Sequence, residues 1–326
     1  MPTCHKLTAI LAFVLSSFTS LSSHAAENTP NPTNDLRAEV ESINTRFGDC
    51  AEKAKVDSLM DFYTRDVIFL PEYKQAIFGI VDLTKFYEDW FRAVKIGSYK
   101  KEIFKVQQLP GYVLEIGHLS VGYAIKGGTE PEGGTMGTAN VYSAKYMIMW
   151  KRNRQGRLRI ISEAFGSDKM INPEEMPYAM VQVKDNPGLK ENHLSKELEP
   201  EILAFDSALV KCILQGDGET RASQFAPDGI YMPHFDKMLV GMDALRPYMI
   251  RTYRPNSIAN VKNTYREILN LGDYVFIDGH FTVGIDNGRV KGTFEGNMSN
   301  LMKRGPDGKL RMYCQLAHND SLPRIN

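Results

Sequence analysis

Apolar residues follow two spacings along this chain, one typical of helices and the other of strands. Between positions 36 and 51 they recur at steps of three and four residues, the spacing of one buried helix face. The same spacing returns at 56–63 and at 82–94. Strands are expected at 67–71, 76–79, 103–109, 112–124, 136–152 and 158–165. This order is typical of an α+β fold in which one curved antiparallel sheet packs on three helices.

The whole pattern then repeats. The segment Gly117–Gly122 returns as Gly279–Gly284, at an offset of 279 − 117 = 162 residues. The same offset aligns four further pairs: Cys50 with Cys212, Asp66 with Asp228, Pro71 with Pro233, and Gly79 with Gly241. Downstream the offset falls to 304 − 152 = 152, because the second copy has a shorter hairpin. We therefore predict two tandem domains, at 35–166 and 198–322, joined by a proline-containing linker at 167–197.

The amino terminus differs from the rest of the chain. His5 and Lys6 precede an apolar run at 7–21, and Ser23-His24-Ala25 then supplies small residues at the positions that a signal peptidase reads. Residues 1–25 are predicted to be a signal peptide, so the mature chain is expected in a bacterial periplasm or secreted. The alternative is a retained membrane anchor, although the run is short for a membrane span.

Composition excludes some classes of partner. Hydrophobic residues make up 43% of the chain and charged residues 24%, as in soluble globular proteins, and the net charge is +0. This balance does not indicate a partner that is a nucleic acid or an anionic membrane. Three cysteines remain after the signal peptide. Cys50 and Cys212 are interpreted as small buried side chains, and a Cys212–Cys314 disulfide is the alternative.

Two matching segments carry a resemblance to a known family. Tyr63–Pro71 and Phe225–Pro233 each place an acidic residue before a strand that ends in proline, and Gly79 and Gly241 end the strand that follows. With the closing hairpin at 146–160, these residues resemble the nuclear transport factor 2-like superfamily, specifically its SnoaL-like branch, which includes ketosteroid isomerase. The resemblance covers both predicted domains.

The resemblance implies a cone-shaped domain, in which the sheet curves around a deep apolar pocket. Family members often dimerise through the outer face of the sheet, so two copies in one chain suggest an intramolecular pseudo-dimer. Association of several chains into a homo-oligomer is also compatible with the resemblance. Ketosteroid isomerases carry a carboxylate base directly before the strand-ending proline. Leu70 and Met232 occupy those positions here and cannot exchange a proton, so isomerase chemistry by that mechanism is not expected.

His118 and His280 occupy the same place in the two copies. Alternation along the second copy places His280 on the face of Tyr274 and Phe276, opposite the face of Val275 and Ile277. If the latter face lines the pocket, the histidines lie in the contact between the domains. The alternatives are a ligand anchor and a general base.

Other polar residues fall on predicted strands. Glu115, Glu163, Asp278 and Glu295 are candidate acids or bases, and His234 and His318 occur only in the second copy. The histidines lack the close spacing of metal ligands, and no glycine-rich loop opens a helix to hold a phosphate. We therefore predict neither a metal nor a cofactor.

The predicted function is binding of a small apolar or aromatic molecule in the cone pockets. Core packing is the alternative role for the aromatic residues. A pocket enzyme that uses one carboxylate or histidine, of isomerase, cyclase or dehydratase type, and a scaffold that assembles through its sheet faces are the alternative functions. The candidate ligand-binding residues are Tyr63, Phe69, Tyr87, Trp90, His118, Tyr231, His234, Tyr248, His280, Glu295 and His318.

Overall fold

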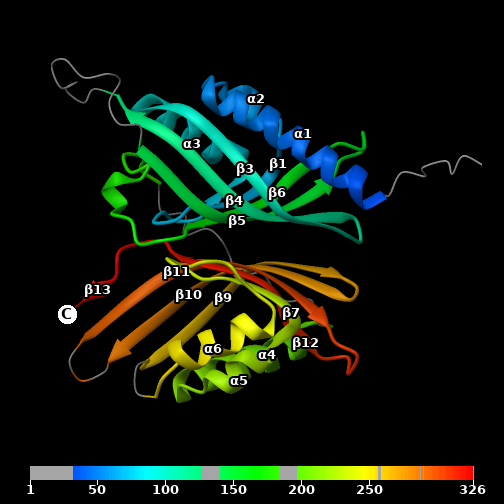
Figure 1. The fold of residues 1–326 in the computed structure, drawn as a ribbon, viewed down its shortest axis with the longest axis vertical. Helices are drawn as coiled ribbons and strands as arrows, with labels where there is room; N and C mark the ends of the chain where they lie inside the picture. The colour runs from blue at the N-terminus through cyan, green and yellow to red at the C-terminus, as the bar shows by residue number, and fades with distance from the viewer. Residues whose placement is uncertain are drawn as a thin grey trace, which may run out of the picture.

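The computed structural model contains two sheets, each covered by helices on one side (Figure 1). It describes residues 32–126, 140–183, 197–255, 258–286, 288 and 290–325. The predicted signal peptide and residues 184–196 of the predicted linker lie outside these ranges. No helix among the described residues is long and apolar enough to cross a membrane.

The first domain has the predicted order of elements. They are α1 (Pro32–Glu52), α2 (Val56–Met60), β1 (Tyr63–Leu70), β2 (Ile77–Phe78), α3 (Gly79–Ala93), β3 (Val94–Leu109), β4 (Tyr112–Ile125), β5 (Asn140–Arg152) and β6 (Leu158–Ser167). The sheet runs β2-β1-β6-β5-β4-β3. The expected all-antiparallel sheet needs one correction, because β1 and β6 pair in parallel while the other neighbours are antiparallel.

The second domain repeats this topology. Its elements are α4 (Glu199–Gln215), α5 (Gly218–Ser223), β7 (Phe225–Met232), β8 (Leu239–Val240), α6 (Met242–Thr252), β9 (Asn260–Leu271), β10 (Tyr274–Asp286), β11 (Lys291–Arg304), β12 (Leu310–Asn319) and β13 (Arg324–Ile325). The sheet runs β8-β7-β12-β11-β10-β9, and β13 pairs with β11. The matching glycines before α3 and α6, Gly79 and Gly241, have φ angles of 79° and 76°, which explains why both copies carry glycine there. The predicted α+β fold with two tandem copies is confirmed.

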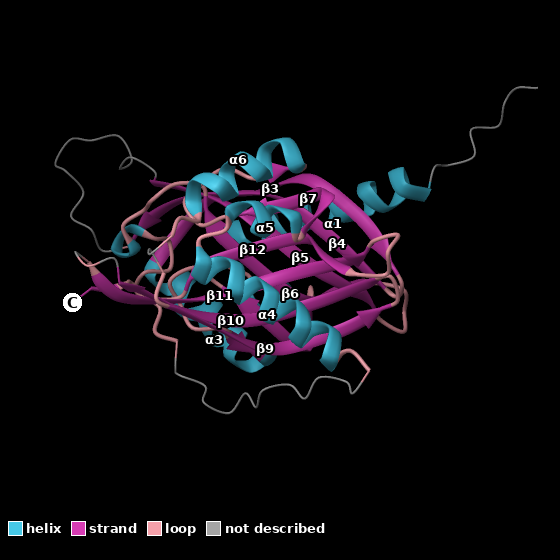
Figure 2. Cartoon of the chain, turned by 90° about the horizontal axis from the view of Figure 1, so that it is seen from below, coloured by secondary structure: helices cyan, strands magenta, loops and turns pink. Residues whose placement is uncertain are grey.

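The two sheets pack against each other through their outer faces, while the helices lie on the sides turned away (Figure 1). Figure 2 shows α4, α5 and α6 across the side of the second sheet that faces away from the first domain. One apolar cluster joins the domains, with Leu114, Ile116 and Met147 from the first and Phe276, Leu301 and Leu316 from the second. Each sheet therefore buries both faces, one under its own helices and the other under the second sheet.

A buried carboxylate also links the domains. Glu72, which follows β1, has no solvent exposure and accepts hydrogen bonds from Tyr142 Oη at 2.6 Å and from Ser167 N at 2.8 Å. His234 of the second domain contacts the same carboxylate, with 2.5 Å between Nε2 and Oε1. Because His234 Nδ1 accepts a hydrogen bond from the Asn319 backbone N–H, its Nε2–H donates a hydrogen bond to Glu72.

Part of the predicted linker packs on the first domain. After β6 the chain forms a 3₁₀ turn at Pro173–Glu175, and Met176, Tyr178 and Val181 are then buried against the aromatic core. The three described cysteines are free thiols, so the alternative Cys212–Cys314 disulfide is wrong. Cys212 and Cys314 are buried, whereas Cys50 is partly exposed.

Candidate functional site

The helix-covered interior of the first domain is filled by aromatic side chains. Tyr63, Phe69, Tyr87 and Trp90, all candidate ligand contacts, are buried in its core. The Tyr87 and Trp90 rings stack with 5.6 Å between centroids, and Phe69 packs edge-on against Phe165 at 5.5 Å. These four residues therefore pack against one another in the core.

A buried ion pair crosses this interior. Lys101 of β3 donates to Glu163 of β6, with 2.7 Å between Nζ and Oε1, and both side chains are only 1% exposed. Tyr63 Oη donates to the other carboxylate oxygen at 2.6 Å and lies 2.9 Å from Tyr87 Oη. The Lys101 ammonium also lies 4.3 Å from the centre of the Phe47 ring. Ion pairing and hydrogen bonds offset the cost of burying these charges.

A second buried carboxylate lies beside this pair. Glu115 of β4 accepts from Asn44 Nδ2 at 2.6 Å, Tyr146 Oη at 2.7 Å and Trp150 Nε1 at 2.8 Å. Burial raises the pKa of Glu115 above its usual value, although the charge of Lys101 and the three hydrogen bonds act in the opposite direction. Burial therefore favours the protonated form of Glu115.

Both networks reach a cavity of about 740 Å³ between α1 and β3. Asn44 and Lys101 form part of its wall, and the candidate His118 lines it from β4. Its further lining residues include Arg37, Glu41, Gly48, Tyr99, Ile103 and Leu119.

The second domain has a cavity at the corresponding place. It measures about 660 Å³, lies between α4 and β9, and is lined by Asp206, Ser207, Val210, Lys211, Leu214, Gln215, Val261, Lys262 and Asn263. The 162-residue offset pairs Asp206 with Asn44 and Asn263 with Lys101. Here the carboxylate is on the helix, where Asp206 Oδ1 accepts from Asn263 Nδ2 at 2.7 Å and from Tyr265 Oη at 2.5 Å. The cavities are equivalent in position but differ in charge.

Tyr231 and Tyr248, the aromatic candidates of the second domain, lie together in its interior. Their ring centroids are 5.9 Å apart, and both side chains are partly exposed. They contrast with the buried aromatic candidates of the first domain.

The structure places His118 and His280 on the sheet faces that are turned toward the other domain, and His118 borders the first cavity from that side together with Ser143 and Asp168. Their neighbours on those faces, Ile116 and Phe276, belong to the cluster that joins the domains. His118 is about half exposed, and its Nδ1 lies 3.8 Å from Asp168 Oδ2. His318 is fully buried, and burial lowers its pKa to about 4, so it is neutral at pH 7.

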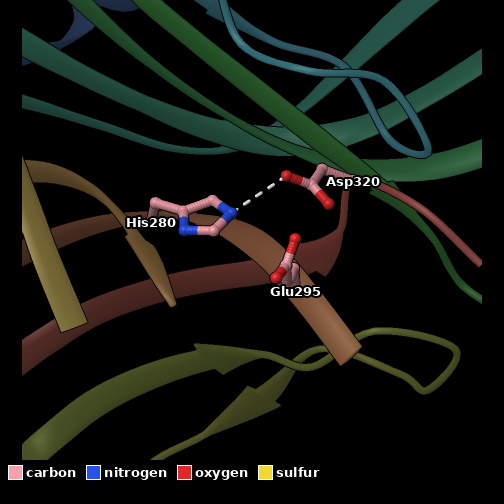
Figure 3. A group of neighbouring side chains, drawn as sticks. All are labelled: His280, Glu295 and Asp320. Carbon is pink, nitrogen blue, oxygen red and sulfur yellow. Dashed lines mark hydrogen bonds and ion pairs between the residues drawn. The ribbon is translucent and has the colours of Figure 1, made fainter. Parts of the chain in front are cut away.

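His280, Glu295 and Asp320 point toward one another (Figure 3). One ligand atom from each lies within 4.8 Å of the others, a set that could hold a divalent cation. These side chains already have partners: His280 Nε2 is 3.0 Å from Asp320 Oδ2, and Arg324 lies 3.6 Å from Glu295. Spacing in the sequence does not reveal this group, because its members come from β10, β11 and the segment after β12.

No protein-family model matches the chain, and no curated protein matches it either. Similar solved structures include a ketosteroid isomerase-like protein from Erwinia carotovora atroseptica SCRI1043, which is 15% identical in sequence. The match covers 39% of this chain and 100% of that chain, with a TM-score of 0.35. An NTF2-like protein from Cytophaga hutchinsonii ATCC 33406 is 11% identical, and the match covers 42% of this chain and 99% of that chain with a TM-score of 0.32. ActVI-ORFA from Streptomyces coelicolor is 14% identical, and the match covers 38% of this chain and 98% of that chain with a TM-score of 0.34. Each match covers about two-fifths of this chain, and none assigns a role to any of its residues.

Proposed function

We propose that this protein binds small apolar or aromatic molecules that also carry a polar group, in the two helix–sheet cavities. One observation carries the proposal: both domains keep a cavity at the same repeat positions, although the residues that line it have diverged. Volumes of about 740 and 660 Å³ lie in the range of small-molecule sites. Apolar wall residues such as Leu119 and Val261 would contact the body of the ligand.

The two cavities would select different polar groups. The first has the Lys101 ammonium and the Asn44 amide in its wall, whereas the second has the Asp206 carboxylate. An acceptor group on the ligand suits the Lys101 ammonium, whereas Asn44 Nδ2 already donates to Glu115; a donor group suits the Asp206 carboxylate of the second cavity.

Native mass spectrometry of the gently purified mature protein tests this proposal. We expect extra mass that disappears on denaturation. Thr45→Trp should fill the first cavity and Ser207→Trp the second, so each should remove its own bound species. Ala38→Trp and Ala208→Trp, at exposed positions of the same two helices, are the matched controls. A clean apo mass for the wild type, or equal loss in the controls, would contradict the proposal.

The second candidate function is acid–base catalysis in the first domain. The raised pKa of Glu115, which reaches the cavity through Asn44, favours this function. A substrate whose turnover by the wild type is abolished by Glu115→Gln, with ligand binding retained, would establish it. Retained turnover in that variant would exclude Glu115 as the catalytic acid or base.

We further propose that the two domains act as an intramolecular pseudo-dimer and that the chain is exported. The apolar cluster between the sheets supports the first statement, since it leaves neither outer sheet face free for assembly with other chains. The amino-terminal pattern that ends at Ala25 supports the second.

A further inference from the structure

Arg221 is a buried cation in the interior of the second domain. It lies on α5, is 2% exposed, and is among the largest fully enclosed side chains of the protein. The first domain has Leu59 at the equivalent position, where it belongs to the core. The fold therefore does not require a charge at this place.

Among the residues that the structure describes, the guanidinium of Arg221 has one hydrogen-bond partner. Its Nη2 donates to Gln315 Oε1 at 2.6 Å, whereas Nε and Nη1 are buried without a partner. No carboxylate in the described part of the chain lies within ion-pair distance of it. Its Cζ lies 4.7 Å from the centre of the Phe225 ring, which supplies some attraction but no counter-charge.

Neighbouring groups that could ionise do not balance this charge. Burial raises the pKa of the Cys212 thiol, although Arg221 itself acts to lower it. Burial likewise raises the pKa of Tyr231 well above its usual value. Both groups are therefore neutral at pH 7. An arginine is always charged, and burying that charge without a partner costs several kcal/mol.

Three tyrosines pack in the same interior as Arg221. Tyr231, Tyr248 and Tyr253 are each partly exposed although they pack in the second interior. The Tyr253 ring centroid is 6.0 Å from Arg221 Cζ, and the Phe225 and Tyr231 ring centroids are 5.7 Å apart. The 162-residue offset pairs the tyrosines with Phe69, Phe86 and Phe91, all of which are buried.

We propose that Arg221 binds the carboxylate of a small aromatic acid, whose ring lies against the tyrosines of the second domain. Nε and Nη1 point to different sides of the guanidinium, so a carboxylate would accept from one of these unpaired donors and supply the missing counter-charge. The aromatic wall would contact the flat body of the ligand. This site shares no lining residue with the α4–β9 cavity and adds a second place for a ligand in the same domain.

Thermal unfolding with paired probes tests the proposal. Benzoate and cinnamate should raise the Tm of the mature wild-type protein by about 3 °C at ten times their Kd, whereas benzamide and cinnamamide should not. Arg221→Leu introduces the residue that the first domain already has at this position. It should raise the Tm of the unliganded protein and abolish the response to both carboxylates. Arg246→Leu, at an exposed position of α6, is the matched control and should respond as the wild type does.

Arg221→Gln is the second variant, because it keeps a hydrogen-bond donor toward Gln315 without the charge. It should fold and fail to respond to carboxylates. Equal responses to benzoate and benzamide, a carboxylate response that survives in both variants, or no response of the wild type at 10 mM probe would each overturn the proposal. None of these results depends on the cavity variants Thr45→Trp and Ser207→Trp, so the two proposals fail separately.

Discussion

The buried ion pair between Lys101 and Glu163 should show strong energetic coupling. The second domain has Asn263 and Gln315 at the equivalent positions, so Lys101→Asn and Glu163→Gln are substitutions that this fold already accommodates. Lys101→Asn should lower the free energy of unfolding of the first domain by about 5 kcal/mol, because two carboxylates, Glu163 and Glu115, lose their buried cation. Glu163→Gln should cost only about 3 kcal/mol, because Lys101 keeps Glu115 as a partner.

The double variant should cost much less than the sum of the single variants, because it removes both charges of the pair. We expect a coupling energy of about 3 kcal/mol or more. Urea denaturation followed by tryptophan fluorescence measures this, because Trp90 and Trp150 both lie in the first domain and the chain has 2 tryptophans in all. Lys85→Asn, on the exposed side of α3, is the control and should change stability by less than about 0.5 kcal/mol. Additive losses in the double variant would refute the reasoning.

Three further predictions concern the domain interface and the amino terminus. Burial raises the pKa of Asp278 from 3.8 to about 6, so the wild type should gain about 2 kcal/mol relative to Asp278→Asn as the pH falls from 7 to 4. A pH-independent difference in urea denaturation would contradict this. Glu72→Ala should lower the free energy of unfolding by about 3–5 kcal/mol at pH 7, because the donors of Tyr142, Ser167 and His234 lose their buried acceptor. A decrease below about 1 kcal/mol in urea denaturation would show that water replaces the carboxylate. Protein recovered from an exporting bacterial host should begin at Ala26 by intact mass, and a full-length membrane-bound species would favour the retained anchor.

Sequence reasoning recovered the architecture because the repeat and the apolar spacing are local signals. The element order of the first domain, the second copy and the three helices in each domain all follow from them. The strand that follows α3 is longer than expected. β3 begins at Val94, where the polar residues that alternate along this edge strand weaken the apolar pattern. The parallel pairing of β1 with β6 has no local signal, since it joins segments about ninety residues apart in the chain.

The candidate sites were less accessible to sequence reasoning. Alternation separates the face of His280 from that of Val275, but only the packing of the two sheets decides which face is covered by the other domain. Glu163 was recognised as a candidate acid, whereas its pairing with Lys101 needs β3 and β6 to approach through the interior. Arg221 was missed, although the offset that aligns it with a core leucine, Leu59, is a signal in the sequence.

The sequence by itself therefore determined the two copies, their elements and their order, because neighbours along the chain set the periodicity of burial. The tertiary structure alone decided how charge is distributed inside each domain. The same fold encloses a paired Lys101 and Glu163 in one copy and an unpaired Arg221 in the other. The physical reason is that burial and charge pairing depend on side chains brought together from distant segments, and no spacing along one strand or helix encodes them.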